Sequence, residues 1–337
     1  MQDAIRVAVL GAGSAAQVVH LPILKRLRQV EVVGLVDVRE RTARTIAERF
    51  AIPNVAANLD ELAEESGFDA VLICLPNHAH EFGVLDALRH GAHVLCERPL
   101  SVSEESARRL VEAADGAGRQ LLVANNHRFH YAVRAIRHFV SSGDLGAVQF
   151  VRSTWLNRRS VRPRRGWRRD KIHEGGGVLM DLGAQAIDMA LWTVDYPAVH
   201  RVRARTWGRS GAVETGAVVQ LGLAGDVAIT VELTWELADE RDHHQLFVLG
   251  SDGTADSEPF RVTRRDTTGI VDVTPPTSRR ARALYTDSYR QEWAEFLRFA
   301  RGEKPIESQT DQVVLAAVLD ACYRSAEEDR EIELTSP

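Results

Sequence analysis

A short run of small residues near the N-terminus has the types and spacing of a phosphate-binding turn. Gly11, Gly13 and Ala16 follow the apolar segment 5–10 in the pattern G-x-G-x-x-A. Gly11 permits a tight turn, Gly13 lets a pyrophosphate approach the bare backbone, and Ala16 lets the next helix lie close to the strand. That helix would present free N–H groups to the phosphates. The run therefore predicts a dinucleotide-binding turn.

A carboxylate suited to the sugar of a dinucleotide ends the next apolar segment, "VEVVGLVDV". This residue, Asp37, could accept hydrogen bonds from both adenosine ribose hydroxyls, and it would repel a 2′-phosphate. It therefore favours NAD over NADP, although Arg39 and Arg41 just beyond it could soften the preference. Alternatively, Asp37 could be an ordinary turn residue at the end of a strand. The glycine run upstream makes this interpretation less favoured.

The segment "HVLCERP", residues 93–99, places a charged side chain where chemistry on a substrate is expected. That residue is Arg98, and an arginine keeps its proton in proteins. Arg98 can hold a substrate oxygen or carboxylate and can stabilise a developing alkoxide, but it cannot act as a base.

The elements that must position these residues alternate between strand and helix. Near-continuous apolar runs predict strands covered on both faces, and Ser101 or Ser103 is a plausible cap for the helix after residue 103. This alternation predicts a doubly wound parallel sheet in a domain of residues 1–124. Ligands of such sheets lie beyond the carboxyl ends of the strands. The segments selected by that rule are 11–16, Asp37, 76–80, 97–99 and 125–129.

The pattern changes after residue 124. An amphipathic helix is expected from residue 131, and several period-2 runs between 147 and 257 predict a mostly antiparallel sheet. A glycine turn at 175–177 feeds a buried helix, and two more helices are expected towards the C-terminus. Residues 125–337 are therefore predicted to form a second, α+β domain.

Composition excludes several classes of function. The chain has 337 residues, 45% of them hydrophobic, and a net charge of −5, which argues against a general binder of nucleic acid or membrane surfaces. No apolar run is long enough to span a bilayer, and the N-terminus lacks a signal-peptide plan. Three scattered cysteines indicate a reducing cytoplasm, and no cluster has metal-ligand spacing.

Taken in order along essentially the whole chain, several segments resemble the Gfo/Idh/MocA family, named for glucose–fructose oxidoreductase, inositol dehydrogenase and a rhizopine-catabolism protein. They include "GAGSAAQVVHLPIL", "CLPNHAHEFGVLDALRHGAHVLCERPLS", "HRFH", "GWRRD", "GGGVLMDLGAQAIDM" and the closing "EWAEFLRFARGEKP". The resemblance implies a Rossmann domain, and then a domain with a large open sheet that commonly mediates dimers or tetramers. It implies hydride transfer between NAD(P) and the carbinol carbon of a sugar, cyclitol or related small molecule.

The resemblance also assigns residues. Cofactor contacts are implied for Pro76, Asn77, His80 and Glu97, with a helix-capping turn as the alternative for His80. The family usually surrounds the reacting oxygen with a lysine from a Glu-Lys-Pro triplet and a histidine one helical turn after an aspartate. Here the triplet contains Arg98, and the helix pair is Asp181 and Gln185.

The two departures change the proton chemistry. A lysine pKa starts near ~10.4 and can be tuned towards ~7–8, whereas arginine stays a donor and glutamine does not titrate. Asp181 remains the leading candidate for the base, with Arg98 and Gln185 beside it in the catalytic set. Other residues near matching segments could substitute for it, namely His127, Tyr131, Lys171 and His173.

The stretch 157–171 is dense in arginine. The stretch could be a clamp for phosphate or carboxylate at the entrance of the substrate site, or it could be a solvated loop, and the two interpretations are equally favoured. The "GWRRD" match makes Trp167 and Arg168 candidates for contact with the substrate. His20, His243 and His244 are interpreted as structural residues.

Two functions remain open at this point. One is an NAD-dependent oxidoreductase acting on a polyhydroxylated or anionic small molecule, which the cofactor segments and Asp181 favour. The other is an altered family member that binds NAD and a ligand without net redox turnover, or uses NAD transiently, which Arg98 and Gln185 favour. The expected assembly is a homodimer or homotetramer.

Overall fold

The computed structural model describes residues 4–158, 175–208, 213–276 and 281–334. The chain divides into two compact units, one of residues 1–126 and 289–313 and the other of residues 127–288 and 314–337. The boundary expected after residue 124 lies close to the first crossing. The return of residues 289–313 to the first unit is not among the sequence expectations.

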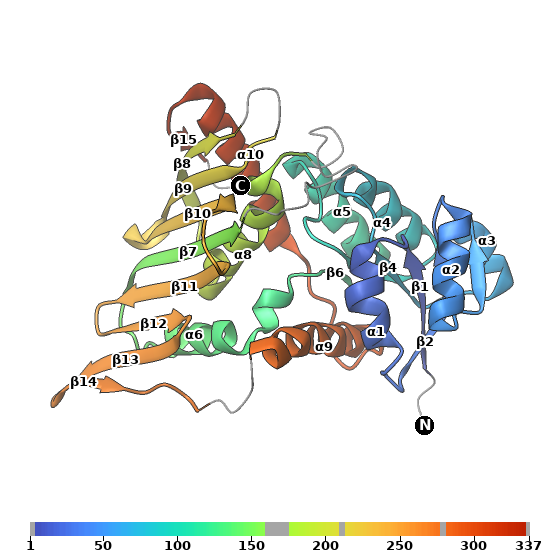
Figure 1. The fold of residues 1–337 in the computed structure, drawn as a ribbon, viewed down its shortest axis with the longest axis horizontal. Coiled ribbons are helices and arrows are strands. Elements are labelled where there is room, and N and C mark those ends of the chain that lie inside the picture. The colour runs from blue at the N-terminus through green and yellow to red at the C-terminus, as the bar shows by residue number, and fades with distance from the viewer. Residues whose placement is uncertain (1–3, 159–174, 209–212, 277–280, 335–337) are drawn as a thin grey trace. The chain divides into compact units, whose positions relative to one another are not determined.

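The first unit contains a parallel sheet with the strand order β3-β2-β1-β4-β5-β6 (Figure 1). The order runs outward from β1 in both directions, so the predicted doubly wound sheet is confirmed. The strands are β1 Ile5–Leu10, β2 Val30–Val36, β3 Asn54–Ala56, β4 Ala70–Ile73, β5 His93–Cys96 and β6 Leu121–Val123. The helices between them are α1 Leu21–Leu24, α2 Glu40–Phe50, α3 Leu59–Glu65, α4 His80–Arg89 and α5 Glu104–Ala117.

Helix α5 shows how local sequence sets these boundaries. The Ser103 side chain accepts a hydrogen bond from the Ser106 N–H at 3.3 Å, so Ser103 and not Ser101 is the cap. Glu104 and Glu105 occupy the first turn, where the helix dipole favours negative charge. Gly118 ends the helix in the left-handed region with φ 61°.

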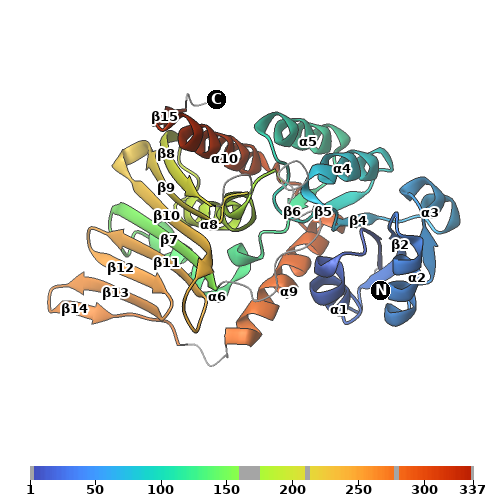
Figure 2. The same ribbon diagram turned by 45° about the horizontal axis from the view of Figure 1, so that its top comes forward.

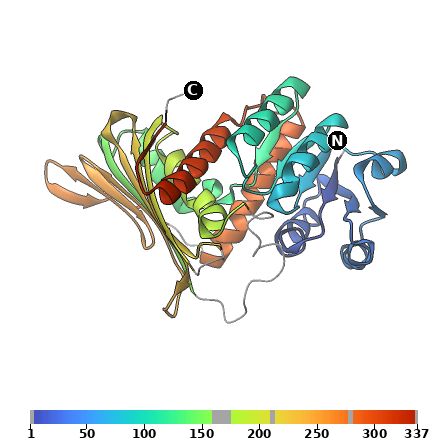
Figure 3. The ribbon, with the colours of Figure 1, turned by 90° about the horizontal axis from the view of Figure 1, so that it is seen from above.

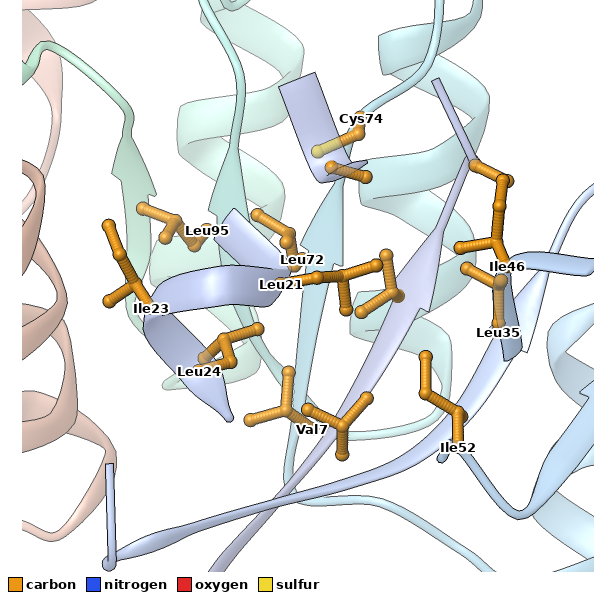
Figure 4. Close-up of a cluster of buried hydrophobic side chains, with 14 of the residues drawn as sticks. Val7, Leu21, Ile23, Leu24, Leu35, Ile46, Ile52, Leu72, Cys74 and Leu95 are labelled. Atoms are coloured by element: carbon orange, nitrogen blue, oxygen red, sulfur yellow. The ribbon is translucent and has the colours of Figure 1, made fainter. Parts of the chain in front are cut away.

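The core of the first unit lies between one face of the sheet and helices that include α1 and α2 (Figure 4). Because successive strand residues point to opposite faces, Val7 and Val9 face this layer together. Trp293 and Phe296 from helix α9, Ala281–Ala300, belong to the same cluster and are fully buried. The labelled side chains in Figure 4 are Val7, Leu21, Ile23, Leu24, Leu35, Ile46, Ile52, Leu72, Cys74 and Leu95.

The second unit is built on a sheet with the order β14-β13-β12-β11-β7-β10-β9-β8-β15 among the described residues. Every pair is antiparallel except β7 with β10, so the mostly antiparallel prediction is confirmed. The strands are β7 Val148–Arg158, β8 Val199–Trp207, β9 Gly216–Leu223, β10 Ala228–Leu237, β11 His243–Gly250, β12 Gly253–Ser257, β13 Phe260–Asp266, β14 Gly269–Asp272 and β15 Ile332–Glu333.

Helices cover one face of this second sheet. Helices α6, Tyr131–Ser141, and α8, Ala184–Thr193, lie on that face with the C-terminal part of α10, Thr310–Glu328 (Figures 2 and 3). No helix of the described residues covers the opposite face, which is therefore an open sheet. Within the described ranges no helix has the length and apolarity that a bilayer crossing needs.

Candidate functional site

The glycine turn has the geometry that a dinucleotide requires. Gly11 has φ +101°, and a Cβ on it would come within 2.5 Å of the Cys74 carbonyl oxygen, so the fold itself demands glycine there. A Cβ on Gly13 would make only an ordinary 3.5 Å contact with the same oxygen. The bare backbone at Gly13 is therefore not explained by packing within the chain, and it fits close approach by a pyrophosphate. Ala16 is fully buried, as close helix packing requires.

Asp37 locks this turn to the end of β2. Its Oδ2 accepts a hydrogen bond from the Ala12 N–H at 2.8 Å, and its Oδ1 accepts one from the Arg39 N–H at 2.8 Å. The Arg39 guanidinium lies 3.3 Å from Oδ1. Burial alone would raise the pKa of Asp37, but the hydrogen bonds from Ala12 and Arg39 outweigh it and lower the pKa. The carboxylate is therefore ionised at neutral pH, as a ribose acceptor must be.

The Glu97 carboxylate is directed at the interior of the first unit. Its Oε1 lies 2.8 Å from His20 Nε2, and its Oε2 accepts a 3.3 Å hydrogen bond from the Arg98 N–H. Burial would raise the pKa of Glu97, but the hydrogen bond from His20, together with the charge and N–H of Arg98, lowers it. On its other side His20 accepts a 3.0 Å hydrogen bond from the Trp293 indole. His20 is therefore a partner of the triplet, a role that its apolar surroundings in the sequence concealed.

Glu292 is a fully buried acid of the same unit. Its side chain is fully buried, and both carboxyl oxygens lack a hydrogen-bond partner. Burial, reinforced by the nearby Glu97 charge, raises the pKa of Glu292 well above its ordinary value. The pKa values of two carboxyl groups in one region are therefore shifted in opposite directions, down for Glu97 and up for Glu292. No sequence signal marks Glu292, since it lies within an ordinary helical pattern.

His80 is fully buried and bridges two loops. Its Nδ1 lies 2.8 Å from the Pro99 carbonyl oxygen, and its Nε2 lies 3.0 Å from the Leu75 carbonyl oxygen. Pro76 precedes a short 3₁₀ turn that contains the buried Asn77. The structure thus gives His80 a role in holding the loops after β4 and β5, and cofactor contacts at Pro76, Asn77, His80 and Glu97 stay predictions.

In the second unit, Asp181 and Gln185 lie at the start of the buried helix. Asp181 is half-buried in a π-helical turn, Leu179–Gly183, and the buried Gln185 lies in the first turn of α8. π-Helical turns are rare and often occur at functional sites. The Asp181 N–H donates to the Gly177 carbonyl oxygen at 3.0 Å, so the glycine turn leads directly into the turn that carries Asp181.

An acid distant in sequence holds that glycine turn. Glu214 Oε1 accepts hydrogen bonds from the Gly177 N–H at 2.8 Å, the Leu179 N–H at 3.1 Å and the Tyr323 hydroxyl at 2.9 Å. A Cβ on Gly176 would come within 1.8 Å of the Tyr323 hydroxyl oxygen. No local sequence pattern marks Glu214, because its partners lie far from it in the chain.

The "HRFH" segment is tied to α8 by a buried ion pair. Arg128 Nε donates to Asp188 Oδ2 at 2.8 Å, and a second guanidinium nitrogen contacts Oδ1. The Tyr196 hydroxyl donates to Asp188 Oδ1 at 2.5 Å. Removing one member would leave a buried charge without its partner, so this cluster stabilises the helix that carries Gln185.

The remaining candidates fall into three groups. The Tyr131 hydroxyl donates to the Pro276 carbonyl oxygen at 3.2 Å, whereas the His127 ring packs edge-on against Trp155 at 4.7 Å. His243 Nε2 lies 2.8 Å from an Asp239 oxygen and His244 Nε2 lies 2.6 Å from the Asn157 oxygen, which fits structural roles. Trp167, Arg168, Lys171 and His173 lie outside the described residues, as does most of the arginine-rich stretch.

Within the described ranges no group of His, Cys, Asp and Glu could hold a metal ion.

The proteins similar to this chain include two named sugar dehydrogenases and one protein whose structure was solved with NAD. D-glucoside 3-dehydrogenase of Escherichia coli (strain K12) is 32% identical over 61% of this chain and 59% of that protein. D-xylose 1-dehydrogenase (NADP(+)) 2 of Haloferax volcanii is 30% identical over 90% of this chain and 92% of that protein. The crystal structure of GenD2 from gentamicin A biosynthesis in complex with NAD superposes with TM-score 0.85 at 26% identity, covering 100% of this chain and 98% of that chain.

Family models match both parts of the chain. Residues 5–125 match the oxidoreductase family with an NAD-binding Rossmann fold, which agrees with the geometry of the glycine turn and Asp37. Residues 133–256 match the GFO/IDH/MocA C-terminal domain, which covers most of the open sheet. The chain therefore belongs to the Gfo/Idh/MocA family of NAD-binding oxidoreductases.

Proposed function

We propose that this protein is an NAD-dependent oxidoreductase that transfers hydride between nicotinamide and a carbinol or carbonyl carbon of a sugar, cyclitol or related small molecule. The observation that carries the proposal is the glycine turn locked by the ionised Asp37, in a chain of this family. The names of the two similar dehydrogenases support a sugar substrate. Arg98 extends the range of substrates to anionic ones, because a guanidinium binds carboxylates and phosphates well.

Oxidation of a hydroxyl requires that its proton leave with the hydride. Bound NAD supplies the hydride acceptor. Asp181 takes the hydroxyl proton in this proposal, because Arg98 and Gln185 cannot accept one. Arg98 binds a substrate oxygen and stabilises the developing alkoxide, and Gln185 orients the substrate by hydrogen bonding. The direction of the reaction is set by the substrate.

The proposal is tested by mixing the protein with NAD and a panel of polyols, sugars and sugar acids. Absorbance should rise at the reduced-nicotinamide band for at least one member, and the reverse reaction should consume that absorbance with the matching carbonyl compound. Calorimetric binding of NAD without turnover of any member would instead favour the altered, non-redox function, to which Arg98 and Gln185 point.

Asp37 should make the protein prefer NAD to NADP. A hydrogen bond to a charged group contributes about 1.5–3 kcal/mol, so Asp37→Ala should weaken NAD binding on the order of 10-fold and narrow the NAD-to-NADP gap. Calorimetric titration of both cofactors checks this. Asp60→Ala, which removes an exposed acid of the same unit, is the matched control and should leave the ratio unchanged. Tighter binding of NADP to the wild-type protein would contradict the assignment.

The open sheet face should be covered by a second copy of the chain. Phe150 and Leu249 are neighbours across β7 and β11 on this face, and the Arg152 guanidinium lies over the Phe247 ring. Large apolar faces are rare on monomers, and symmetric self-association covers them most simply. Light scattering should therefore give a multiple of 37.4 kDa, and Phe150→Glu should shift it towards one chain mass. A wild-type mass near 37.4 kDa at micromolar concentration would contradict this.

We infer a cytoplasmic location from the cysteines. Cys74, Cys96 and Cys322 are free and buried, and chains exposed to oxidising compartments seldom keep such thiols unpaired.

A further inference from the structure

We propose that His20 and Trp293 are positioning residues of the active site, and that they act by fixing the carboxylate of Glu97 next to Arg98. This inference rests on the proposed function for its catalytic consequence. Its structural part, a single tautomer of His20 set by Trp293, stands independently of any reaction.

The tautomer follows from the chemistry of the two partners. The Trp293 indole nitrogen carries a hydrogen and can only donate, and it lies 3.0 Å from His20 Nδ1. Nδ1 must therefore be the unprotonated, accepting nitrogen, which leaves the ring hydrogen on Nε2. Nε2 then donates to Glu97 Oε1 at 2.8 Å. A ring hydrogen on Nδ1 would point at the indole hydrogen, so the reversed tautomer breaks both hydrogen bonds.

Burial makes this arrangement selective. His20 and Trp293 are both fully buried, so water cannot replace a lost partner. The Trp293 and His20 rings also meet edge to face, with centroids 5.9 Å apart. The Glu97 side chain is 18% exposed, so it is the member of the set closest to solvent.

The consequence reaches Arg98 through the backbone. His20 holds Oε1 of Glu97, and this contact fixes the Glu97 rotamer. The other oxygen, Oε2, accepts a hydrogen bond from the Arg98 N–H, so the same carboxylate also fixes the backbone of Arg98. On the far side of Arg98, the Pro99 carbonyl oxygen lies 2.8 Å from His80 Nδ1. Arg98 is thus flanked by two residues that buried histidines hold, which suits a cation that must meet a substrate oxygen in a fixed orientation.

Three elements far apart in sequence supply the set. His20 ends the π-helical turn Ala16–His20 that follows the glycine turn, Glu97 follows β5, and Trp293 comes from α9. The set therefore joins the cofactor turn to the Glu-Arg-Pro segment within the first unit. If Trp293 only filled the core, its indole N–H would not be needed, and phenylalanine could replace it without changing the tautomer of His20.

The first measurement reads the tautomer directly. Side-chain ¹⁵N spectra of the full-length wild-type protein between pH 6 and 8 should show His20 as the Nε2-protonated tautomer, assigned by its loss in His20→Gln. In Trp293→Phe the same signals should move towards a mixture of tautomers. Trp207→Phe, which changes a half-exposed tryptophan of the second unit, is the matched control and should leave them unmoved. A wild-type His20 protonated on Nδ1 would overturn the proposal.

The second measurement reads the catalytic consequence. Trp293→Phe should lower kcat about 10-fold with a substrate the wild type turns over, because one hydrogen bond in a buried charged set is lost. The calorimetric affinity for NAD should fall by less than kcat does, and a loss of NAD affinity as large as the loss of kcat would overturn the positioning of Arg98. His20→Gln keeps an amide N–H able to reach Glu97 and should retain more activity than His20→Phe. Equal losses in the two His20 variants, with both folded by circular dichroism, would overturn the positioning role.

The two proposals fail in different ways. A wild type that binds NAD and turns over no substrate contradicts the proposed function, while the ¹⁵N spectra still decide whether Trp293 sets the His20 tautomer. If Trp293→Phe does not fold, the wild-type tautomer and the comparison of His20→Gln with His20→Phe still test the positioning role.

Discussion

Asp181→Asn is expected to lower kcat by about 100-fold or more while leaving NAD affinity unchanged, because a positioned general base contributes on that scale. Asparagine keeps the shape of the side chain and cannot accept the hydroxyl proton. The half-buried position of Asp181, in a π-helical turn that the glycine turn feeds, places it on a rigid support. Steady-state kinetics on the substrate found in the panel, with NAD titrated by calorimetry, measures both quantities.

Asp195→Asn is the matched control, since it makes the same substitution in the same unit on a side chain that is 88% exposed. It should keep wild-type turnover. If Asp181→Asn keeps full activity instead, the base lies elsewhere, and His173 and Tyr131 become the residues to substitute next.

The altered residues of the site give a further comparison. Arg98→Ala should raise the substrate KM and also lower kcat, because the proposed role of the guanidinium is both to bind a substrate oxygen and to stabilise the developing alkoxide. Combining Arg98→Lys with Gln185→His restores the residues that the family usually carries. A wild type inactive on every substrate of the panel, together with a gain of activity in this double variant, would establish the non-redox function.

The second large effect concerns stability and pH. Glu292 has a pKa raised well above its ordinary value of 4.5 by burial and by the Glu97 charge. A carboxyl group that is easier to protonate in the folded state stabilises it fully below about pH 4.5. That stabilisation is lost as pH rises towards the raised pKa, at up to about 1.4 kcal/mol per pH unit. Glu292→Gln cannot ionise and should remove this decline.

Urea unfolding between pH 5 and 9 measures the difference between the two proteins. Their unfolding midpoints should diverge as pH rises, with Glu292→Gln the more stable at alkaline pH. Glu295→Gln, on the same helix, is the control. Burial would raise the pKa of Glu295, but its pairing with Lys304 lowers it, so that variant should lose stability only on the alkaline side of about pH 4.5. Parallel pH profiles for wild type and Glu292→Gln would show that Glu292 is not a buried neutral acid.

Local chemistry made part of the site predictable. A few dozen neighbouring residues encode the glycine turn, Asp37 and the alternation of strands and helices. The structure has the tight turn at Gly11, the Asp37 side chain at the end of β2 and the parallel sheet that these patterns predict. The mostly antiparallel second sheet follows from equally short patterns, whereas the pattern left Ser101 and Ser103 open as the cap of α5 and the structure decides for Ser103.

The parts that sequence reasoning missed depend on distant partners. The hydrogen-bond partners of His20 are Glu97, which is 77 positions away in the chain, and Trp293, which is 273 positions away. No local sequence pattern therefore reveals that His20 holds Glu97. Glu214 holds a glycine turn from 37 positions away. Glu292 lies in a helix whose pattern would suit an exposed acid equally well, yet the structure buries it completely.

The return of residues 289–313 to the first unit has a consequence for synthesis of the chain. Trp293 and Phe296 fill the core beside strand residues from Val7 to Leu95, which are synthesised about 200 to 290 residues earlier. N-terminal domains usually fold while the ribosome is still working, but this one lacks part of its interior until α9 has emerged. The nascent N-terminal segment must therefore wait, with apolar surface uncovered, through translation of almost the entire second unit. We therefore expect a fragment of residues 1–126 to expose apolar surface that α9 covers in the full chain.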